Sequence, residues 1–246
     1  MNAIEDNVWS RGFSDLGSLL PRPRAILAVS AHWYIRGTAV TGNDFPSTIH
    51  DFGGFPEALY EIQYLAKGDP GLANRVVDLL GADAASTRLD WGLDHGTWSV
   101  LHHVWPKADV PVVQLSIDRG ADALRHVEIG RALAPLRDEG VLILGSGNIV
   151  HNLGDAIARM RSGAFDTPPW AAAFDGAVVD ALEEHDPAEL ARLVESPEGR
   201  KAHPTPDHYL PLLYAAGAAS EDLVSFPITG FDLGSLSMRS VIFGAT

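Results

Sequence analysis

Residues 141–152 read VLILGSGNIVHN, an apolar run followed directly by two glycines, an asparagine and a histidine. A short aliphatic run is typical of a buried β-strand, and glycines let the backbone turn sharply and approach a ligand closely. The stretch AILAVSAHW (25–33) is built alike, and it delivers His32. In open α/β sheets ligands lie outside the carboxyl ends of the strands. Two strands that each lead to a histidine there indicate one shared functional site.

The rest of the chain alternates between strand and helix patterns. Short apolar runs predict strands over 24–30, 110–117, 141–145, 223–228 and 237–243. Helical spacing predicts helices over 71–80, 121–137, 170–184 and 187–194, with a further helix starting near Asp207. Strands separated by helices favour a central, mostly parallel (mixed) sheet covered on both faces. We therefore expect an α/β fold, a three-layer α/β/α sandwich, as one domain over residues 1–246.

Composition excludes several functional classes. The 246 residues include no cysteine, so disulfides, thiolate nucleophiles and cysteine-ligated metals are absent, and a metal would need His, Asp or Glu ligands. A formal net charge of -14 argues against a nucleic-acid partner. No apolar stretch reaches the roughly 18 to 20 residues that span a bilayer, and no signal peptide is recognisable, so we expect a cytoplasmic protein without membrane contact.

The ten histidines differ in their surroundings. A lone histidine is most often structural, and we expect this of His102, His103, His126 and His185. Four others lie beside glycines, prolines, aspartates or strand ends: His32, His95, His151 and His208. His50 precedes an aromatic, glycine-rich loop, which could either cover an aromatic ligand or form a plain surface turn. Several such loops in a cysteine-free chain favour a histidine-rich metal site, because imidazole suits Fe(II) and Zn(II). The phosphate-binding loop GxxxxGK[ST], the zinc motif HExxH and the nucleophile elbow GxSxG are absent.

Seven stretches, spread in order through nearly the whole chain, match one known family. They are SAHW (30–33), TIHDFGGFP (48–56), WGLDHGTW (91–98), PVVQLSID (111–118), GSGNIVHNL (145–153), PTPDHYLPLLY (204–214) and GSLSMRS (234–240). Together they resemble the class III extradiol ring-cleaving dioxygenases, in particular the DOPA 4,5-dioxygenase branch of the family that includes the catalytic chain of protocatechuate 4,5-dioxygenase.

The resemblance implies a non-haem Fe(II) enzyme that opens a small catechol, DOPA-like or other, with O2, although Zn(II) could be the metal loaded. It implies that His32 and His208 are metal ligands and that His151 is a ligand or the acid/base beside the metal. His95 and His151 would be catalytic, and a neutral histidine would take the catechol proton and later return it. We expect His50, Phe52 and Tyr209 to bind the substrate. A monomer or small homo-oligomer is expected.

The amino terminus departs from the family pattern. Family members begin with a short strand that ends in an HGSP motif, whose histidine is a metal ligand, and MNAIEDN (1–7) stands where that motif has just ended. We expect the first strand and one ligand to be missing, either because the start is placed one strand too late or because the chain is naturally shortened.

Two other functions remain open at this stage. The alternative to the dioxygenase is a catalytically impaired zinc-binding homologue that acts as a binding or assembly module. A zinc hydrolase on the same scaffold is less well supported, because the matched motifs contain no obvious Glu or Asp base.

Overall fold

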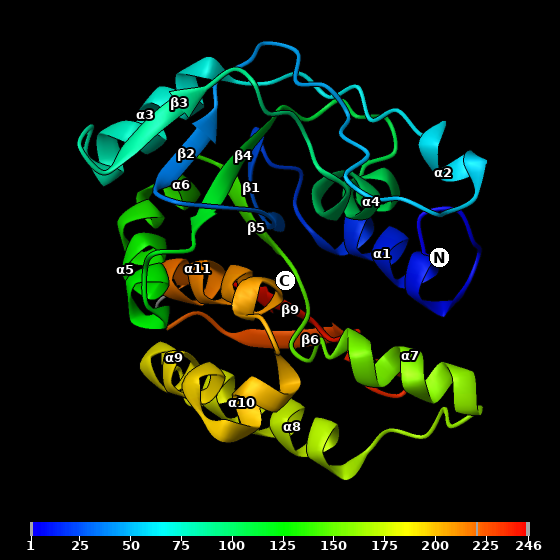
Figure 1. The fold of residues 1–246 in the computed structure, drawn as a ribbon. Coiled ribbons are helices and arrows are strands. Elements are labelled where there is room, and N and C mark those ends of the chain that lie inside the picture. Colours follow the sequence, from blue (N-terminus) through cyan, green and yellow to red (C-terminus); the bar gives the residue numbers. More distant parts are fainter. Residues whose placement is uncertain (1, 220, 245–246) are drawn as a thin grey trace. The chain divides into compact units, whose positions relative to one another are not determined.

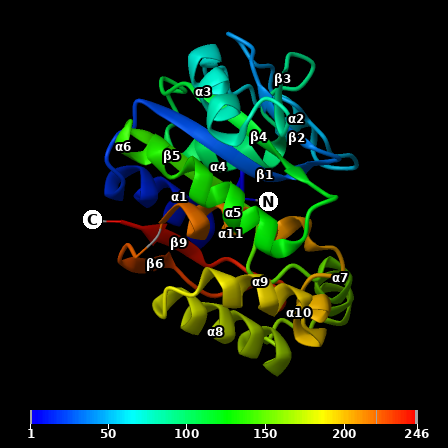
Figure 2. The ribbon, with the colours of Figure 1, turned by 90° about the vertical axis from the view of Figure 1, so that its left-hand side faces the viewer.

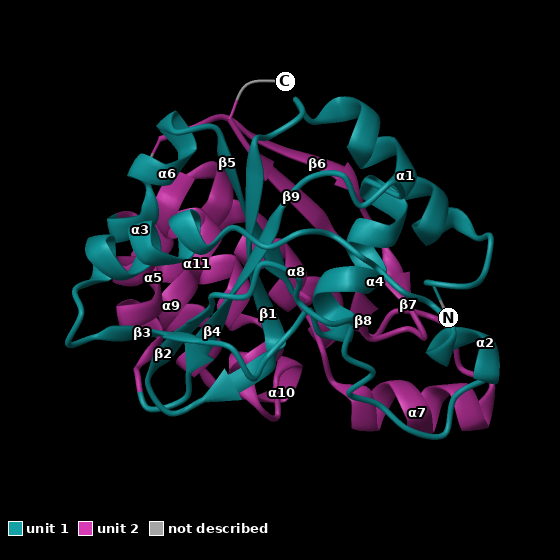
Figure 3. Ribbon diagram, turned by 90° about the horizontal axis from the view of Figure 1, so that it is seen from above, with its two compact units in different colours: residues 1–120, 132–146, 246 teal, residues 121–131, 147–245 magenta. Residues whose placement is uncertain are grey.

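The computed structural model describes residues 2–219 and 221–244 (Figure 1). The chain divides into two compact units (Figure 3). Among the described residues, unit 1 comprises 2–120 and 132–146, and unit 2 comprises 121–131, 147–219 and 221–244. The expectation of a single domain therefore stays a prediction, and each unit is described by itself.

Unit 1 is built on a five-stranded mixed sheet with the order β3-β2-β4-β1-β5. β1 pairs in parallel with β4 and β5, and β3 pairs in parallel with β2, whereas β2 and β4 are antiparallel. Its strands are β1 (Ala25–Ile35), β2 (Thr38–Thr41), β3 (Ala85–Arg88), β4 (Val112–Asp118) and β5 (Val141–Ser146). Residues 25–29 of β1 are fully buried, which explains why this strand is continuously apolar. The expected mostly parallel sheet is confirmed.

Helices flank this sheet. α4 packs on β1 and β5, α3 packs on β2, β3 and β4, α6 packs on β5, and α1 packs on α4. The helices of unit 1 are α1 (Val8–Leu19), α2 (Glu57–Tyr60), α3 (Pro70–Leu80), α4 (His95–Val104) and α6 (Pro135–Asp138). The expected helix over 121–137 is divided into α5 (Ala123–Leu133) and α6, because Pro135 has no N–H and starts a new helix as its first residue. The α/β class, with helices on a central mixed sheet, is confirmed.

β1 is longer than the sequence suggests. It continues to Ile35, five residues beyond its expected end, and its pairing register with β4 is interrupted between Val29 and Tyr34. His32 therefore lies within an irregular part of the strand and not after the strand has ended. Such irregularities bend a strand and redirect its side chains.

Two of the expected strands belong to another sheet. In unit 2, β6 (Val224–Ile228) pairs antiparallel with β9 (Ser240–Phe243), and β7 (Phe231–Asp232) pairs with β8 (Leu236–Ser237). Neither pair joins the central sheet. Gly230 and Gly234 have φ angles of 112° and 76°, values that favour glycine, and they allow the chain to reverse within a few residues. Short reversals of this kind give antiparallel neighbours.

The rest of unit 2 is helical. α8, α9 and α10 pack on one another (Figure 2), and α11 packs on α9 and β9. The helical segments are α7 (Leu153–Ser162), α8 (Pro169–Glu183), α9 (Pro187–Glu195), α10 (Pro197–Ala202), the 3-10 helix η1 (Pro206–His208) and α11 (Leu210–Ala219). Within residues 2–219 and 221–244, no helix has the length and apolar character needed to cross a membrane.

Candidate active site

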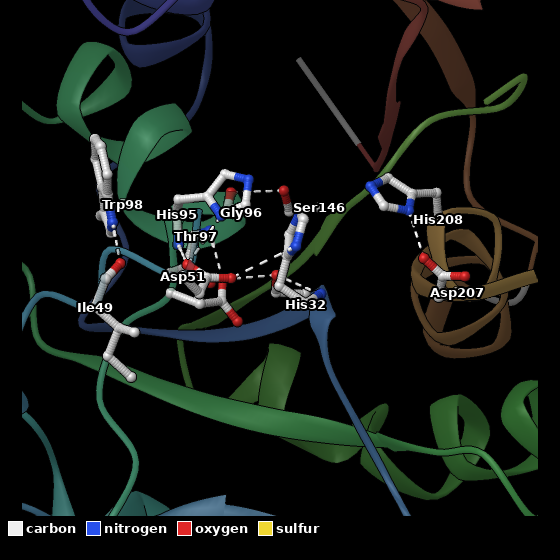
Figure 4. Close-up of polar contacts among 12 residues, drawn as sticks. His32, Ile49, Asp51, His95, Gly96, Thr97, Trp98, Ser146, Asp207 and His208 are labelled. Atoms are coloured by element: carbon white, nitrogen blue, oxygen red, sulfur yellow. Dashed lines mark hydrogen bonds and ion pairs between the residues drawn. The ribbon is translucent and has the colours of Figure 1, made fainter. Parts of the chain in front are cut away.

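In unit 1, two histidines and one aspartate lie together (Figure 4). His32 comes from the irregular part of β1, His95 is the first residue of α4, and Asp51 lies in the loop before α2. The Asp51 Oδ1 is 2.9 Å from the Nδ1 of His95, and its Oδ2 is 3.5 Å from the Nδ1 of His32. One ligand atom from each residue lies within 4.8 Å of the others. This cluster, which we call the His32–Asp51–His95 cluster, has a donor set that could hold a metal ion.

A buried carboxylate joins the helix of His95 to the strand of His32. Asp94 caps α4 by accepting a hydrogen bond from the Thr97 N–H at 3.1 Å. The same carboxylate accepts a hydrogen bond from the Ser30 hydroxyl at 2.7 Å and another from the Gln114 amide. Asp94 is fully buried, and burial raises the pKa of its carboxyl group. These contacts fix the first turn of α4 against β1 and β4.

Gly96 gives the His32 ring its space. A Cβ atom at residue 96 would lie 2.4 Å from the Ser30 hydroxyl oxygen and 2.8 Å from the His32 Cδ2. The Gly96 carbonyl also accepts a hydrogen bond of 2.6 Å from the Ser146 hydroxyl at the end of β5. A side chain at this position would displace the imidazole from the first turn of α4.

Asp51 was not among the sequence candidates. Burial raises the pKa of its carboxyl group, but hydrogen bonds from the His95 ring and backbone together lower it below the ordinary value. Its side chain is only 18% exposed. No local pattern revealed its role, because the contact with His95 spans 44 residues. The one sequence signal was the position of Asp51 between His50 and Phe52, in the stretch TIHDFGGFP that carries the family resemblance.

Aromatic side chains surround one side of His95. The Phe52 ring meets the His95 ring edge-on with centroids 5.2 Å apart, and Tyr60 and Trp98 contact Phe52. His50 lies against Phe52 and Trp98, and its Nε2 is 3.0 Å from the Ile62 carbonyl oxygen. Of the three expected substrate-binding residues, Phe52 therefore lies next to His95, and His50 lies against Phe52.

In unit 2, His151 and His208 form a second histidine pair. Their rings stack in parallel, with centroids 3.6 Å apart and an interplanar angle of 1°. The His208 Nδ1 is 2.6 Å from the Asp207 carboxylate (Figure 4). His208 ends η1, just before α11, close to the first helical turn that the sequence predicted.

The GSGN segment holds His151 by close backbone contacts. A Cβ at Gly147 would lie 2.1 Å from the His208 carbonyl oxygen, which also accepts a 2.8 Å hydrogen bond from the Asn148 N–H. The Asn148 side chain donates to the Ser237 carbonyl at 2.8 Å, and the His151 N–H donates to the Ala202 carbonyl at 3.0 Å. The glycine and asparagine of the opening motif are therefore required by the approach of this loop to the segment that carries His208.

Tyr209, within PTPDHYLPLLY, and His203, just before it, are structural. Tyr209 is fully buried, and its hydroxyl donates to the Leu190 carbonyl at 3.1 Å. Its expected contact with substrate is corrected to a position in the core of unit 2, where the hydroxyl is already used. His203 is also buried, its Nε2 is 2.7 Å from the Ile149 carbonyl oxygen, and burial lowers the pKa of its imidazole to about 4.

Asp207 is expected to make the stability of the fold depend on pH in the acid range. Burial would raise the pKa of Asp207, but hydrogen bonds from His208 and Thr205 outweigh it and lower the pKa from 3.8 to about 2. A carboxylate with a lowered pKa stabilises the fold above its unfolded value, and this stabilisation is lost as the pH falls through the folded value. Wild-type protein should therefore be more stable than Asp207→Asn near neutral pH, and the difference should shrink between pH 3.8 and about 2. Urea unfolding midpoints of metal-free protein measure this, and a difference that stays constant over that interval would contradict it.

Comparison with known proteins decides the family. The family model described as the catalytic LigB subunit of aromatic ring-opening dioxygenase matches residues 15–243. The chain belongs to this family. The 4,5-DOPA dioxygenase extradiol of Escherichia coli K12 is 47% identical to this family member over 249 residues, which cover 99% of the chain and 91% of that relative. The protein of the same name from Beta vulgaris is 40% identical, with coverage of 100% and 93%.

A solved structure agrees with the assignment to the LigB family. The crystal structure of an uncharacterised protein from Escherichia coli K12 matches with a TM-score of 0.80 and 41% identity, over 97% of this chain and 93% of that one. The resemblance to the DOPA 4,5-dioxygenase branch of the extradiol enzymes is therefore confirmed, and the chain is an extradiol ring-cleaving dioxygenase.

Proposed function

We propose that this LigB-family enzyme opens the ring of a small catechol beside its two hydroxyls, with O2 and a bound Fe(II) ion. The observation that carries the proposal is the His32–Asp51–His95 cluster in a chain matched to the family over residues 15–243. Relatives named 4,5-DOPA dioxygenase extradiol support a DOPA-like catechol as substrate. A small aromatic diol and O2 are then the reactants, while a cytoplasmic location, the absence of a nucleic-acid partner and a monomeric or small homo-oligomeric state stay predictions.

The residues present fit a metal. Imidazole suits Fe(II) and Zn(II) alike, and a carboxylate on the other ring nitrogen is the usual partner of a metal-binding histidine. We propose His32 as a ligand through Nε2, because its Nδ1 faces Asp51. The same reasoning applies to His208, whose Nδ1 faces Asp207, and we propose His151 as a further ligand or acid/base. When bound, the iron would supply coordination of the catechol oxygens and a route for electrons from the ring to O2.

We propose that histidines carry out the proton transfers. His95 directs Nδ1 to Asp51, so its Nε2 can hydrogen-bond a substrate oxygen. We propose that His151, in its neutral form, accepts a catechol proton and returns it as the ring opens, which requires a pKa near the working pH. We propose that Phe52, which lies beside His95, and His50, which lies against Phe52, bind the aromatic ring.

Oxygen uptake tests the proposal. Protein loaded with Fe(II) under anaerobic conditions should consume O2 with L-DOPA or a simple catechol and form a yellow ring-opened product. Protein loaded with Zn(II) should bind the metal without uptake. The control is His102→Gln on α4, which lies outside both histidine groups and should retain the wild-type rate. If Fe(II)-loaded protein retains its metal but takes up no O2 with any catechol, the proposal is contradicted and the zinc-binding module is favoured.

A further inference from the structure

We propose that Asp51 is a positioning residue that fixes the tautomer and the orientation of His32 and His95 at the same time. Its consequence for catalysis rests on the proposed function, whereas its effect on the two imidazoles does not. No site role was expected for Asp51 from the sequence, because its partners are distant along the chain.

Both oxygens of the carboxylate are used. Oδ1 accepts a 2.9 Å hydrogen bond from the His95 backbone N–H and lies 2.9 Å from the His95 Nδ1. Oδ2 lies 3.5 Å from the His32 Nδ1, on the other ring. The two ring centroids are only 3.8 Å apart, so one carboxylate reaches both. The side chains of His32 and His95 remain 25% and 29% exposed, which leaves them accessible to a ligand.

The chemistry of a carboxylate decides the tautomers. An ionised carboxylate only accepts hydrogen bonds, so it favours the tautomer of a neutral imidazole that carries its proton on the facing Nδ1. The lone pair is then on Nε2 in both His32 and His95. A carboxylate that holds the other ring nitrogen is the usual partner of a metal-binding histidine, and it raises the basicity of the ligand. Asp51 thereby directs two Nε2 lone pairs away from itself.

The loop that carries Asp51 is itself fixed. The Ile49 N–H donates to the Leu93 carbonyl at 2.7 Å, and the Ile49 carbonyl accepts a 2.8 Å hydrogen bond from the Trp98 indole. Thr48 forms a parallel bridge with Leu93. These three contacts tie the residues before Asp51 to α4 and to the segment that precedes it. Asp51 is therefore held in place by backbone contacts that a change of its side chain leaves intact.

Replacing Asp51 with asparagine should affect the two imidazoles differently. Asparagine keeps one acceptor oxygen and replaces the other with an NH2 donor. Because His95 offers two donors and His32 offers one, the oxygen should stay with His95, and the NH2 group should face the His32 Nδ1. Asp51→Asn should then keep the Nδ1–H tautomer of His95 and shift His32 to Nε2–H. Asp51→Ala should release both rings.

Histidine tautomers are measured by long-range ¹H–¹⁵N NMR correlations on metal-free protein near pH 8, well above the ordinary imidazole pKa of about 6.5. Signals are assigned with His32→Gln and His95→Gln. We expect Nδ1–H for both rings in wild type, a change of His32 alone in Asp51→Asn, and a change of both in Asp51→Ala. Glu57→Ala, which removes an exposed carboxylate six residues along the chain, should leave both unchanged.

Metal binding gives the second readout. In calorimetric titrations with Zn(II), Asp51→Ala should weaken binding by about 10 to 100-fold, the range seen when the hydrogen-bond partners of metal ligands are removed. Unchanged tautomers in Asp51→Ala would overturn the proposal. Loss of binding far beyond 100-fold with unchanged tautomers would make Asp51 a ligand and overturn it as well. The tautomers and affinities could change as expected although the wild-type protein cleaves no catechol. That result would support the role of Asp51 and reject the proposed function.

Discussion

Replacing His32 with glutamine is expected to weaken metal binding by more than about 100-fold and to abolish O2 uptake with catechols. Loss of a direct ligand should exceed the roughly 10 to 100-fold effect of losing a residue that only hydrogen-bonds a ligand. The His32 ring is mounted on β1, and its contact with the first turn of α4 depends on the absence of a side chain at Gly96. Glutamine has a length close to that of histidine but lacks the imidazole nitrogen pair.

The matched control for His32→Gln is His102→Gln, the same chemical change at a half-buried position on α4. Calorimetric titration with Zn(II) and an oxygen electrode with Fe(II)-loaded protein measure the two effects, and circular dichroism checks that the fold is retained. A folded His32→Gln protein with wild-type affinity and turnover would show that His32 is not a ligand.

Gly147→Ala is expected to cause the largest loss of stability among the single substitutions considered. The new Cβ would lie 2.1 Å from the His208 carbonyl oxygen and 3.3 Å from the Pro211 ring, and the backbone must move because the first contact is with main-chain atoms. Overpacking of this kind costs about 1 to 3 kcal/mol, and the shift also strains the hydrogen bond between Asn148 and His208. We expect a melting temperature several degrees lower and weaker metal binding.

Gly176→Ala serves as the control for Gly147→Ala. Gly176 lies inside α8, and a Cβ there meets no atom within 4 Å. Because alanine is favoured over glycine in a helix by up to about 1 kcal/mol, this variant should be slightly more stable than wild type. Thermal unfolding of both variants tests the contrast. Equal stability of Gly147→Ala and wild type would contradict the close approach of the two backbones.

The sequence was informative wherever burial or close contact dictates a residue type. β1 and β4 read as apolar runs because buried strands have no polar face, whereas β5 is apolar although most of its residues are only half-buried. The space at Gly96 and the turn after β5 were also predictable, because only glycine tolerates a backbone or ring so close to its Cα. These features account for the fold class and for the choice of His32, His95 and His151.

Features that depend on distant partners were not predictable. β2 and β3 are four residues each and contain Thr, Ser and Arg, so their identity as strands comes from pairing and not from an apolar pattern. Asp51 acquires its role only when the chain brings it to His95. Tyr209 stands beside His208 in the sequence, but the turn into α11 directs its ring into the core. Adjacent residues therefore had different roles that no local pattern distinguishes.

The most direct test of extradiol cleavage is the identity of the product formed under ¹⁸O-labelled O2. Fe(II)-loaded protein is given L-DOPA, and the product is analysed by mass spectrometry together with NMR of the carbon skeleton. We predict a ring-opened product that contains both labelled oxygen atoms and is cleaved beside the two hydroxyls. An intact ring, a product cleaved between the hydroxyls, or incorporation of a single labelled atom would contradict the account.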